Sequence, residues 1–177
     1  MRRKVNKYKI SKGNKFLGPI PSFSLLAPHA IKPSSLIKKQ GVIESYRSNY
    51  HCSLRDDFVE VMVKKIKKYR LFIINTFGSF YSQEYINKWV EIAKQCEYTY
   101  FFAYIRHSCN YYDYPKVAKL NWISYNNNID RSKYDCVVSK ELSDLKLDHI
   151  VCPKYMSKNI SCFQCRGCFD KVDVLIP

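Results

Sequence analysis

The sequence lacks any apolar run approaching the roughly 20 residues that a bilayer-spanning helix needs, so we expect no membrane partner. Its basic N-terminus is not followed by the apolar segment of a secretory signal, and we expect the chain to work in a reducing compartment. In such a compartment the 8 cysteines are more often metal ligands, core thiols or catalytic groups than disulfides. Internal repeats and low-complexity tracts are also missing.

Acidic residues are few. The 177 residues include 30 Lys and Arg against 15 Asp and Glu, which gives a formal net charge of +15. This excess raises affinity for polyanions without specifying a fold, and nucleic acid is the commonest such partner. The charge alone does not separate RNA, DNA and a membrane surface, and a soluble protein that is simply basic is the alternative interpretation. We assign nucleic-acid binding to the N-terminal arm through Arg2, Arg3, Lys4, Lys7, Lys9, Lys12 and Lys15.

The length fits one domain with its own core. We divide the chain into a basic arm at residues 1–18, an α/β core at 19–151 and a cysteine-rich tail at 152–177. Residues 18–36 contain four prolines and should be ordered but irregular, with one short strand. Apolar residues at three- and four-residue spacing predict helices at about 55–68 and 83–96, and Ser82 is a candidate N-cap for the second.

Short runs rich in β-forming residues predict the strands, at 71–77, 98–105, 120–125, 135–139 and 149–152. Strands that alternate with helical or irregular connections predict a single α/β domain with a mostly parallel sheet. A partial or barrel-like closure of that sheet is left open. Binding sites in such sheets lie at the C-terminal ends of the strands. This rule nominates a pocket at that edge, formed by Asn75, Ser79, Arg106 and His107.

The last quarter of the chain holds four cysteines in the pattern C-x9-C-x2-C-x2-C, namely Cys152, Cys162, Cys165 and Cys168. Two intervening residues allow neighbouring thiolates to reach one centre, and four thiolates suit a zinc ion or an iron–sulfur cluster. The C-x2-C-x2-C run favours iron–sulfur slightly over zinc, and both remain open, as does a tail with no metal. The other cysteines, Cys52, Cys96, Cys109 and Cys136, are expected to be small apolar side chains.

Four blocks of the chain form a recognisable set: "ISKGNKFLGPIPSFSLLAP", "FGSFYSQEYINKWVEIA", "FFAYIRHS" and the closing "CPKYMSKNISCFQCRGCF". Together they resemble the phage-encoded gene product 88 proteins. The central and closing blocks are the most specific. The resemblance implies a phage or plasmid protein in the cytoplasm of a bacterial host. It supplies no assigned reaction.

The departures from the family pattern lie mainly in its N-terminal half. Lys32 and Pro33 stand where the family has Cys-Pro, and no cysteine follows in the stretch where the family has C-x2-C. The family's His-x-Ser-Gly-Asp core reads here as residues 75–79, Asn-Thr-Phe-Gly-Ser, so its histidine and carboxylate are missing. The chain has kept the C-terminal cysteine group and lost the N-terminal one.

Three functions follow from this sequence. The first is a non-catalytic protein whose four-cysteine metal site is structural and which associates with nucleic acid or a replication partner. The second is an iron–sulfur redox protein or an enzyme of radical-type barrel ancestry, an analogy at the level of the fold. The third is an enzyme that uses His107 and Cys109 as an activated nucleophile, but no third group is identifiable to orient that pair.

Overall fold

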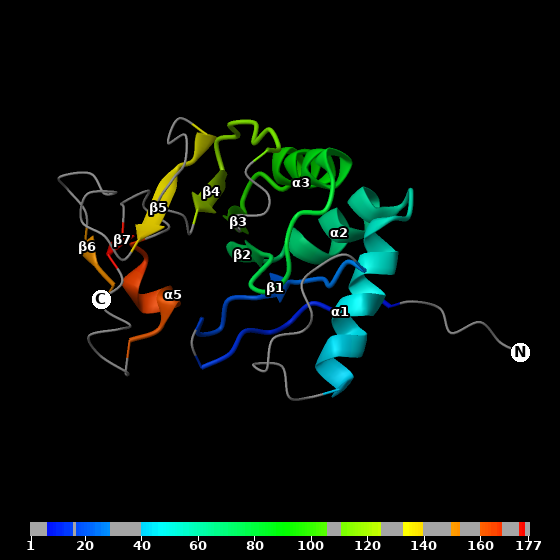
Figure 1. The fold of residues 1–177 in the computed structure, drawn as a ribbon, viewed down its shortest axis with the longest axis horizontal. Helices are drawn as coiled ribbons and strands as arrows, with labels where there is room; N and C mark the ends of the chain where they lie inside the picture. The colour runs from blue at the N-terminus through cyan, green and yellow to red at the C-terminus, as the bar shows by residue number, and fades with distance from the viewer. Residues whose placement is uncertain are drawn as a thin grey trace, which may run out of the picture.

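The computed structural model describes residues 7–15, 17–28, 40–105, 111–124, 133–139, 150–152, 160–167 and 174–175. Its strands are β1 (Ser22–Phe23), β2 (Leu71–Ile74), β3 (Tyr100–Ile105), β4 (Leu120–Ser124), β5 (Cys136–Ser139), β6 (Ile150–Val151) and β7 (Val174–Leu175). Its helices are α1 (Gln40–Ser53), α2 (Phe58–Ile66), α3 (Gln83–Gln95) and the short α5 (Cys162–Cys165). Figure 1 shows α2 and α3 beside the first strands, and α5 apart from these two helices.

The described strands form one sheet in the order β1-β2-β3-β4-β5-β7-β6, and every pair of neighbours is parallel. The α/β class and the parallel sheet predicted from the sequence are therefore confirmed. Within the described residues β1 and β6 stand at the two ends of this order, so these strands make an open sheet and not a closed barrel. In that same part of the chain no helix is long and apolar enough to cross a membrane.

Alternate residues of the strands belong to two separate apolar clusters. Phe72, Phe101 and Trp122 pack in a large cluster with the helices α2 and α3, which we call the main core. Ile73, Phe102 and Ile123 pack in a smaller cluster with Leu17 and other residues. Because side chains alternate between the faces of a strand, the sheet has an apolar core on each face. We call the smaller group the second core, and its buried members are Leu17, Ile20, Ile73, Phe102, Ile123 and Val138.

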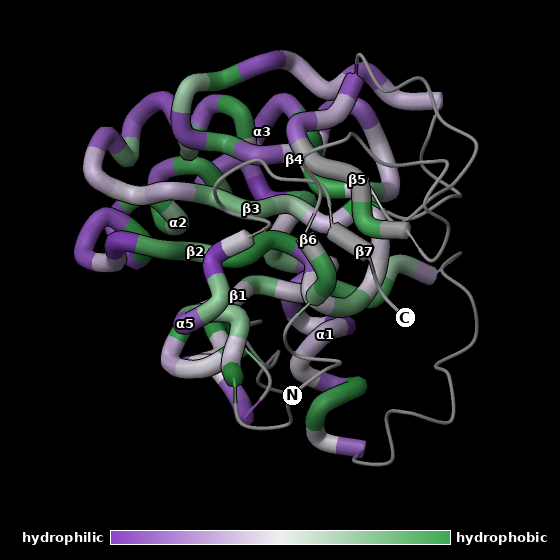
Figure 2. The backbone as a smooth tube through the Cα atoms, turned by 90° about the vertical axis from the view of Figure 1, so that its left-hand side faces the viewer, coloured by the Kyte–Doolittle hydropathy of each residue, from purple (hydrophilic) through white to green (hydrophobic). Residues whose placement is uncertain are grey.

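The two predicted helices exist, and each buries the apolar face that its sequence pattern predicts. Met62 in α2 and Trp89 in α3 are fully buried, and Ser82 accepts a hydrogen bond from the Tyr85 backbone N–H at 3.1 Å, as an N-cap does. Figure 2 shows hydrophilic and hydrophobic stretches alternating along these helices, which is typical of helices with one face in solvent. Both helices end slightly earlier than the apolar pattern predicts, at Ile66 and Gln95.

No pattern in the sequence predicted α1. The buried residues of this helix are Asn49, Cys52 and Ser53, so its inner face is polar or small and shows no apolar periodicity. Asn49 explains this composition because its amide joins two segments. Its Nδ2 donates to the carbonyl oxygens of Lys9 and Ser24 at 2.8 Å, and its Oδ1 accepts from the Lys9 N–H at 2.7 Å. The helix therefore packs through specific hydrogen bonds.

The second strand ends earlier than predicted, because the backbone leaves the extended conformation at Asn75 with φ of 57°. Gly78 then has φ of +88°, and a Cβ added there would lie 1.9 Å from the carbonyl oxygen of Leu25. Only glycine allows the corner after β2 to approach the segment after β1 this closely. The apolar run at 71–77 therefore contains a strand and the start of a tight corner.

Candidate functional site

The four tail cysteines are placed only in part by the described residues. Cys152 directly follows β6, whereas Cys162 and Cys165 begin and end the short helix α5. Cys168 lies outside the described residues. All three of these described cysteines are partly buried, and Cys152 and Cys162 both pack against the second core. Two cysteines separated by nine residues therefore meet the same apolar surface of the sheet.

Local interactions fix the turn that carries Cys162 and Cys165. Ser161 and Gln164 form a capping box at the start of α5, and Arg166 ends the helix in the left-handed region with φ of 59°. The Phe163 N–H donates to the Leu17 carbonyl oxygen at 3.3 Å. A Cβ added at Gly18 would lie 3.0 Å from the Phe163 Cβ, so glycine allows α5 to approach the residues that precede β1.

The donor set of the tail suits a zinc ion or an iron–sulfur cluster, since both are held by thiolates. Among the described residues, however, no three His, Cys, Asp or Glu side chains lie close enough together to hold a metal ion. Cys152, Cys162 and Cys165 are therefore not a preassembled three-ligand centre. A metal bound by these thiols would have to draw them together, which links its binding to the folding of the tail.

Two of the scattered cysteines, one in α1 and one at the end of α3, are buried. Cys52 is fully buried in α1, and Cys96 is 2% exposed at the end of α3. Burial raises the pKa of both thiols, because it disfavours the charged thiolate. Both behave as the small apolar residues predicted from their scattered positions. Cys109 and its proposed partner His107 lie outside the described residues.

The predicted pocket at the C-terminal edge of the sheet is described only at β2. Asn75 is 1% exposed, and neither its Oδ1 nor its Nδ2 has a hydrogen-bond partner among the described residues. Ser124, at the end of β4, is fully buried, and within the same part of the chain its hydroxyl also lacks a partner. Buried polar atoms without partners are rare and costly, so this edge carries unusual polar groups. Ser79 is partly buried after the corner, and Arg106 and His107 lie outside the described residues.

Hydrogen bonds that begin at Ser24 hold the corner next to Asn75. The Ser24 hydroxyl lies 2.7 Å from the Thr76 hydroxyl and accepts from the Phe77 N–H at 3.2 Å. Sequence reasoning missed Ser24 because it falls in the proline-rich segment, which has no periodic pattern. The only available signal was its place directly after a short apolar stretch that could form a strand.

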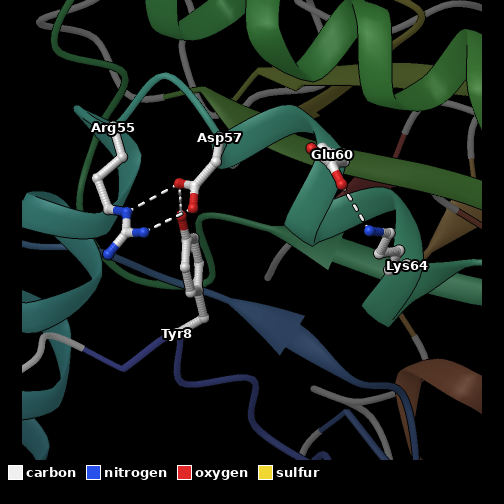
Figure 3. A network of polar contacts seen from close by, with 5 residues as sticks. All are labelled: Tyr8, Arg55, Asp57, Glu60 and Lys64. Atoms are coloured by element: carbon white, nitrogen blue, oxygen red, sulfur yellow. Dashed lines mark hydrogen bonds and ion pairs between the residues drawn. The ribbon is translucent and has the colours of Figure 1, made fainter.

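The basic arm is tied to the core where it is described. Tyr8 donates to Asp57 Oδ1 at 2.8 Å, and Arg55 forms an ion pair with the same carboxylate at 2.6 Å (Figure 3). Ser11 and Ser22 exchange two backbone hydrogen bonds of 2.8 and 3.0 Å. Lys7, Lys9, Lys12 and Lys15 are exposed along this segment, whereas Arg2, Arg3 and Lys4 lie outside the described residues. The four lysines are therefore held at fixed places on the surface.

The comparisons with known proteins gave one match. The family model described as "Gene product 88" matches residues 37–139, which run through α1, the two packed helices and the strands β2 to β5. The match includes Asn75 and Ser79 and ends before Cys152. No curated protein and no solved structure matched the chain. Because the family model covers more than half of the 177 residues, the chain belongs to the gene product 88 family.

Proposed function

We propose that this chain is a non-catalytic, nucleic-acid-associated member of its family, and that its tail cysteines bind one metal centre that fastens the tail to the sheet. The observation that carries the metal site is the position of Cys152 and Cys162. They come from different elements and pack against the same second core. Cys165 follows one helical turn after Cys162, and Cys168 completes the set of four thiols.

The chemistry of such a centre follows from its ligands. Four thiolates would hold a zinc ion in tetrahedral geometry, or an iron–sulfur cluster, and the closely spaced C-x2-C-x2-C run favours the cluster. Because the described thiols are not preassembled, the free energy of metal binding would appear as folding free energy of the tail. A structural role is favoured over catalysis because Asn75 and Ser79 replace the family's histidine and carboxylate.

The metal site is tested by measuring metal content in protein purified without oxygen. We expect one zinc ion, or one iron–sulfur cluster with a brown visible absorption, per chain. Cys152→Ser and Cys162→Ser should each lose most of the metal. Cys96→Ala, at a cysteine buried in the main core, is the matched control and should keep it. Wild-type protein without metal, or the same loss in the control, would contradict the proposal.

The association with nucleic acid is supported by the arrangement of the arm. Tyr8 and Ile10 pack against the main core, and Lys7 and Lys9 alternate with them on the exposed side. A fixed row of ammonium groups can neutralise phosphates and release their counterions. The charge of +15 adds long-range attraction for any polyanion.

The arm is best tested by changing its charges, because deletion would also remove the Tyr8 and Ser11 contacts to the core. Lys7, Lys9, Lys12 and Lys15 can each be replaced by glutamine in one variant. We expect weaker binding to DNA and RNA, with a salt dependence reduced by up to about one unit per lysine. An unchanged salt dependence would show that the arm does not contact phosphates.

A further inference from the structure

Two exposed tyrosines stand at the N-terminal edge of the sheet, which is the edge opposite Asn75. Tyr98 is 72% exposed and Tyr100 is 52% exposed, although the residue between them, Thr99, is fully buried. Thr99 is held by two hydrogen bonds. Its hydroxyl donates to the Tyr69 carbonyl oxygen at 2.7 Å, and its N–H donates to the Cys96 carbonyl oxygen at 3.0 Å. Both rings therefore extend into solvent from an anchored segment.

A lysine from the neighbouring strand connection lies against both rings. The Lys119 ammonium is 5.9 Å from the centre of the Tyr98 ring and 5.6 Å from that of Tyr100. The same ammonium donates to the backbone carbonyl oxygen of Glu97. Cation–π attraction and this hydrogen bond hold one positive charge between two aromatic rings. These contacts restrict the three side chains, so less conformational freedom would be lost on binding.

Backbone pairing places further positive charge in the same row. The Tyr100 N–H donates to the Arg70 carbonyl oxygen at 2.8 Å, and the Phe101 N–H donates to the Lys119 carbonyl oxygen at 2.7 Å. Arg70 therefore stands beside Tyr100 on one side and Lys119 on the other, and the Arg70 residue is exposed. We call Arg70, Tyr98, Tyr100 and Lys119 the tyrosine platform.

The surroundings of the platform are basic. Lys67 and Lys68 precede Arg70 at the end of α2 and are exposed, and the Lys68 ammonium lies 5.2 Å from the centre of the Tyr69 ring. Glu97 is the one acidic residue in the segments 67–70 and 97–100 that form this edge. The charge therefore suits an anionic partner, and the exposed rings suit a partner with flat aromatic groups.

We propose that the tyrosine platform binds single-stranded nucleic acid, with bases stacked on Tyr98 and Tyr100 and phosphates near Arg70 and Lys119. This inference rests on the nucleic-acid association proposed above and names the strand type and the surface. Exposed aromatic rings beside a basic track bind single strands because unpaired bases can stack on them. In a duplex the bases are already stacked and paired, so the rings would add little to its binding.

The test uses the full chain and a fluorescent oligothymidylate of about 16 nucleotides, a length within the usual site sizes of single-strand binders. Changing both Tyr98 and Tyr100 to alanine should weaken binding by about fivefold to 150-fold for each stacked base lost. The salt dependence should stay the same, because stacking releases no counterions. Changing both tyrosines to phenylalanine should preserve binding, since the rings remain.

Tyr111→Ala is the matched control, because Tyr111 is 73% exposed and lies outside the platform; it should bind like wild type. The proposed role of the platform is wrong if the double alanine variant binds oligothymidylate as tightly as wild type. If that result comes with a loss of binding in the arm variant, the proposed nucleic-acid association stands without the platform. If wild-type protein binds neither single strand nor duplex at low salt, both proposals are wrong.

Discussion

At the scale of single residues, the fold depends on a few positions where the backbone conformation or a close contact restricts which residue fits. Asn75 and Gly78, both at positive φ, turn the chain after β2 toward the segment after β1. The sequence placed both residues at a strand end, because a glycine after an apolar run indicates a corner. It could not reveal that the Asn75 side-chain amide is buried with no partner in the part of the chain that the structure describes, since this depends on segments far apart in the chain.

Gly78→Ala tests the corner after β2. The new Cβ would lie 1.9 Å from the Leu25 carbonyl oxygen, and φ of +88° is strained for any residue with a side chain. We expect the free energy of unfolding to fall by more than about 1 kcal/mol in urea denaturation. Gly41→Ala is the control, because a Cβ there meets nothing within 4 Å and alanine favours the α1 helix. Equal effects of the two changes would contradict the close approach.

Asp57→Asn tests the contact that ties the arm to the core (Figure 3). Hydrogen bonds from Arg55 and then from Tyr8 hold the pKa of Asp57 below its ordinary value. A lowered folded-state pKa stabilises the protein above the unfolded pKa of about 4, and this stability is lost as the pH falls through the folded value. Asp57→Asn should therefore lower the free energy of unfolding at pH 7.

The difference in unfolding free energy between wild type and Asp57→Asn should shrink as the pH falls from about 5 toward 3, as urea denaturation at several pH values would show. High salt should also reduce this difference, because the ion pair is partly exposed. A difference that stays constant across this pH range would mean that the Asp57 charge does not hold the arm.

At the scale of elements, the sequence predicted those whose apolar pattern matches their burial. The strands β2 and β3 and the helices α2 and α3 were located within a few residues, because each buries a continuous or periodic apolar face. The elements that were missed bury little apolar surface of their own. Helix α1 packs through Asn49, α5 has only four residues, and β7 has two.

Ser82→Ala tests the start of α3. The Ser82 hydroxyl accepts from the Tyr85 N–H at 3.1 Å, and alanine would leave that donor without its partner. We expect a loss of about 0.5 to 2 kcal/mol in the free energy of unfolding, measured by thermal or urea denaturation. Ser82→Asp keeps an acceptor at the cap and should be much closer to wild type. If the alanine and aspartate variants are equally unstable, the cap hydrogen bond contributes nothing.

At the scale of the whole molecule, described segments near both ends of the chain pack onto a parallel sheet whose order the sequence could not specify. The arm pairs with the segment at β1 through Ser11 and Ser22, and α5 contacts Leu17 just before it. Alternating strands and helices predicted parallel pairing, but the insertion of β7 between β5 and β6 depends on contacts that no local pattern encodes. One described segment of the tail, β7, is therefore a strand of the sheet, and Cys152 and Cys162 lie beside the second core.

The central claim is that a metal bound by the tail cysteines fastens the tail to the sheet. It is tested most directly by hydrogen–deuterium exchange of the anaerobically purified protein before and after removal of the metal by a chelator. We predict that exchange in residues 160–167 becomes much faster without metal, whereas β2 and β3 stay equally protected. Metal removal that leaves the exchange of residues 160–167 unchanged would contradict the claim, as would protein that contains no metal when isolated.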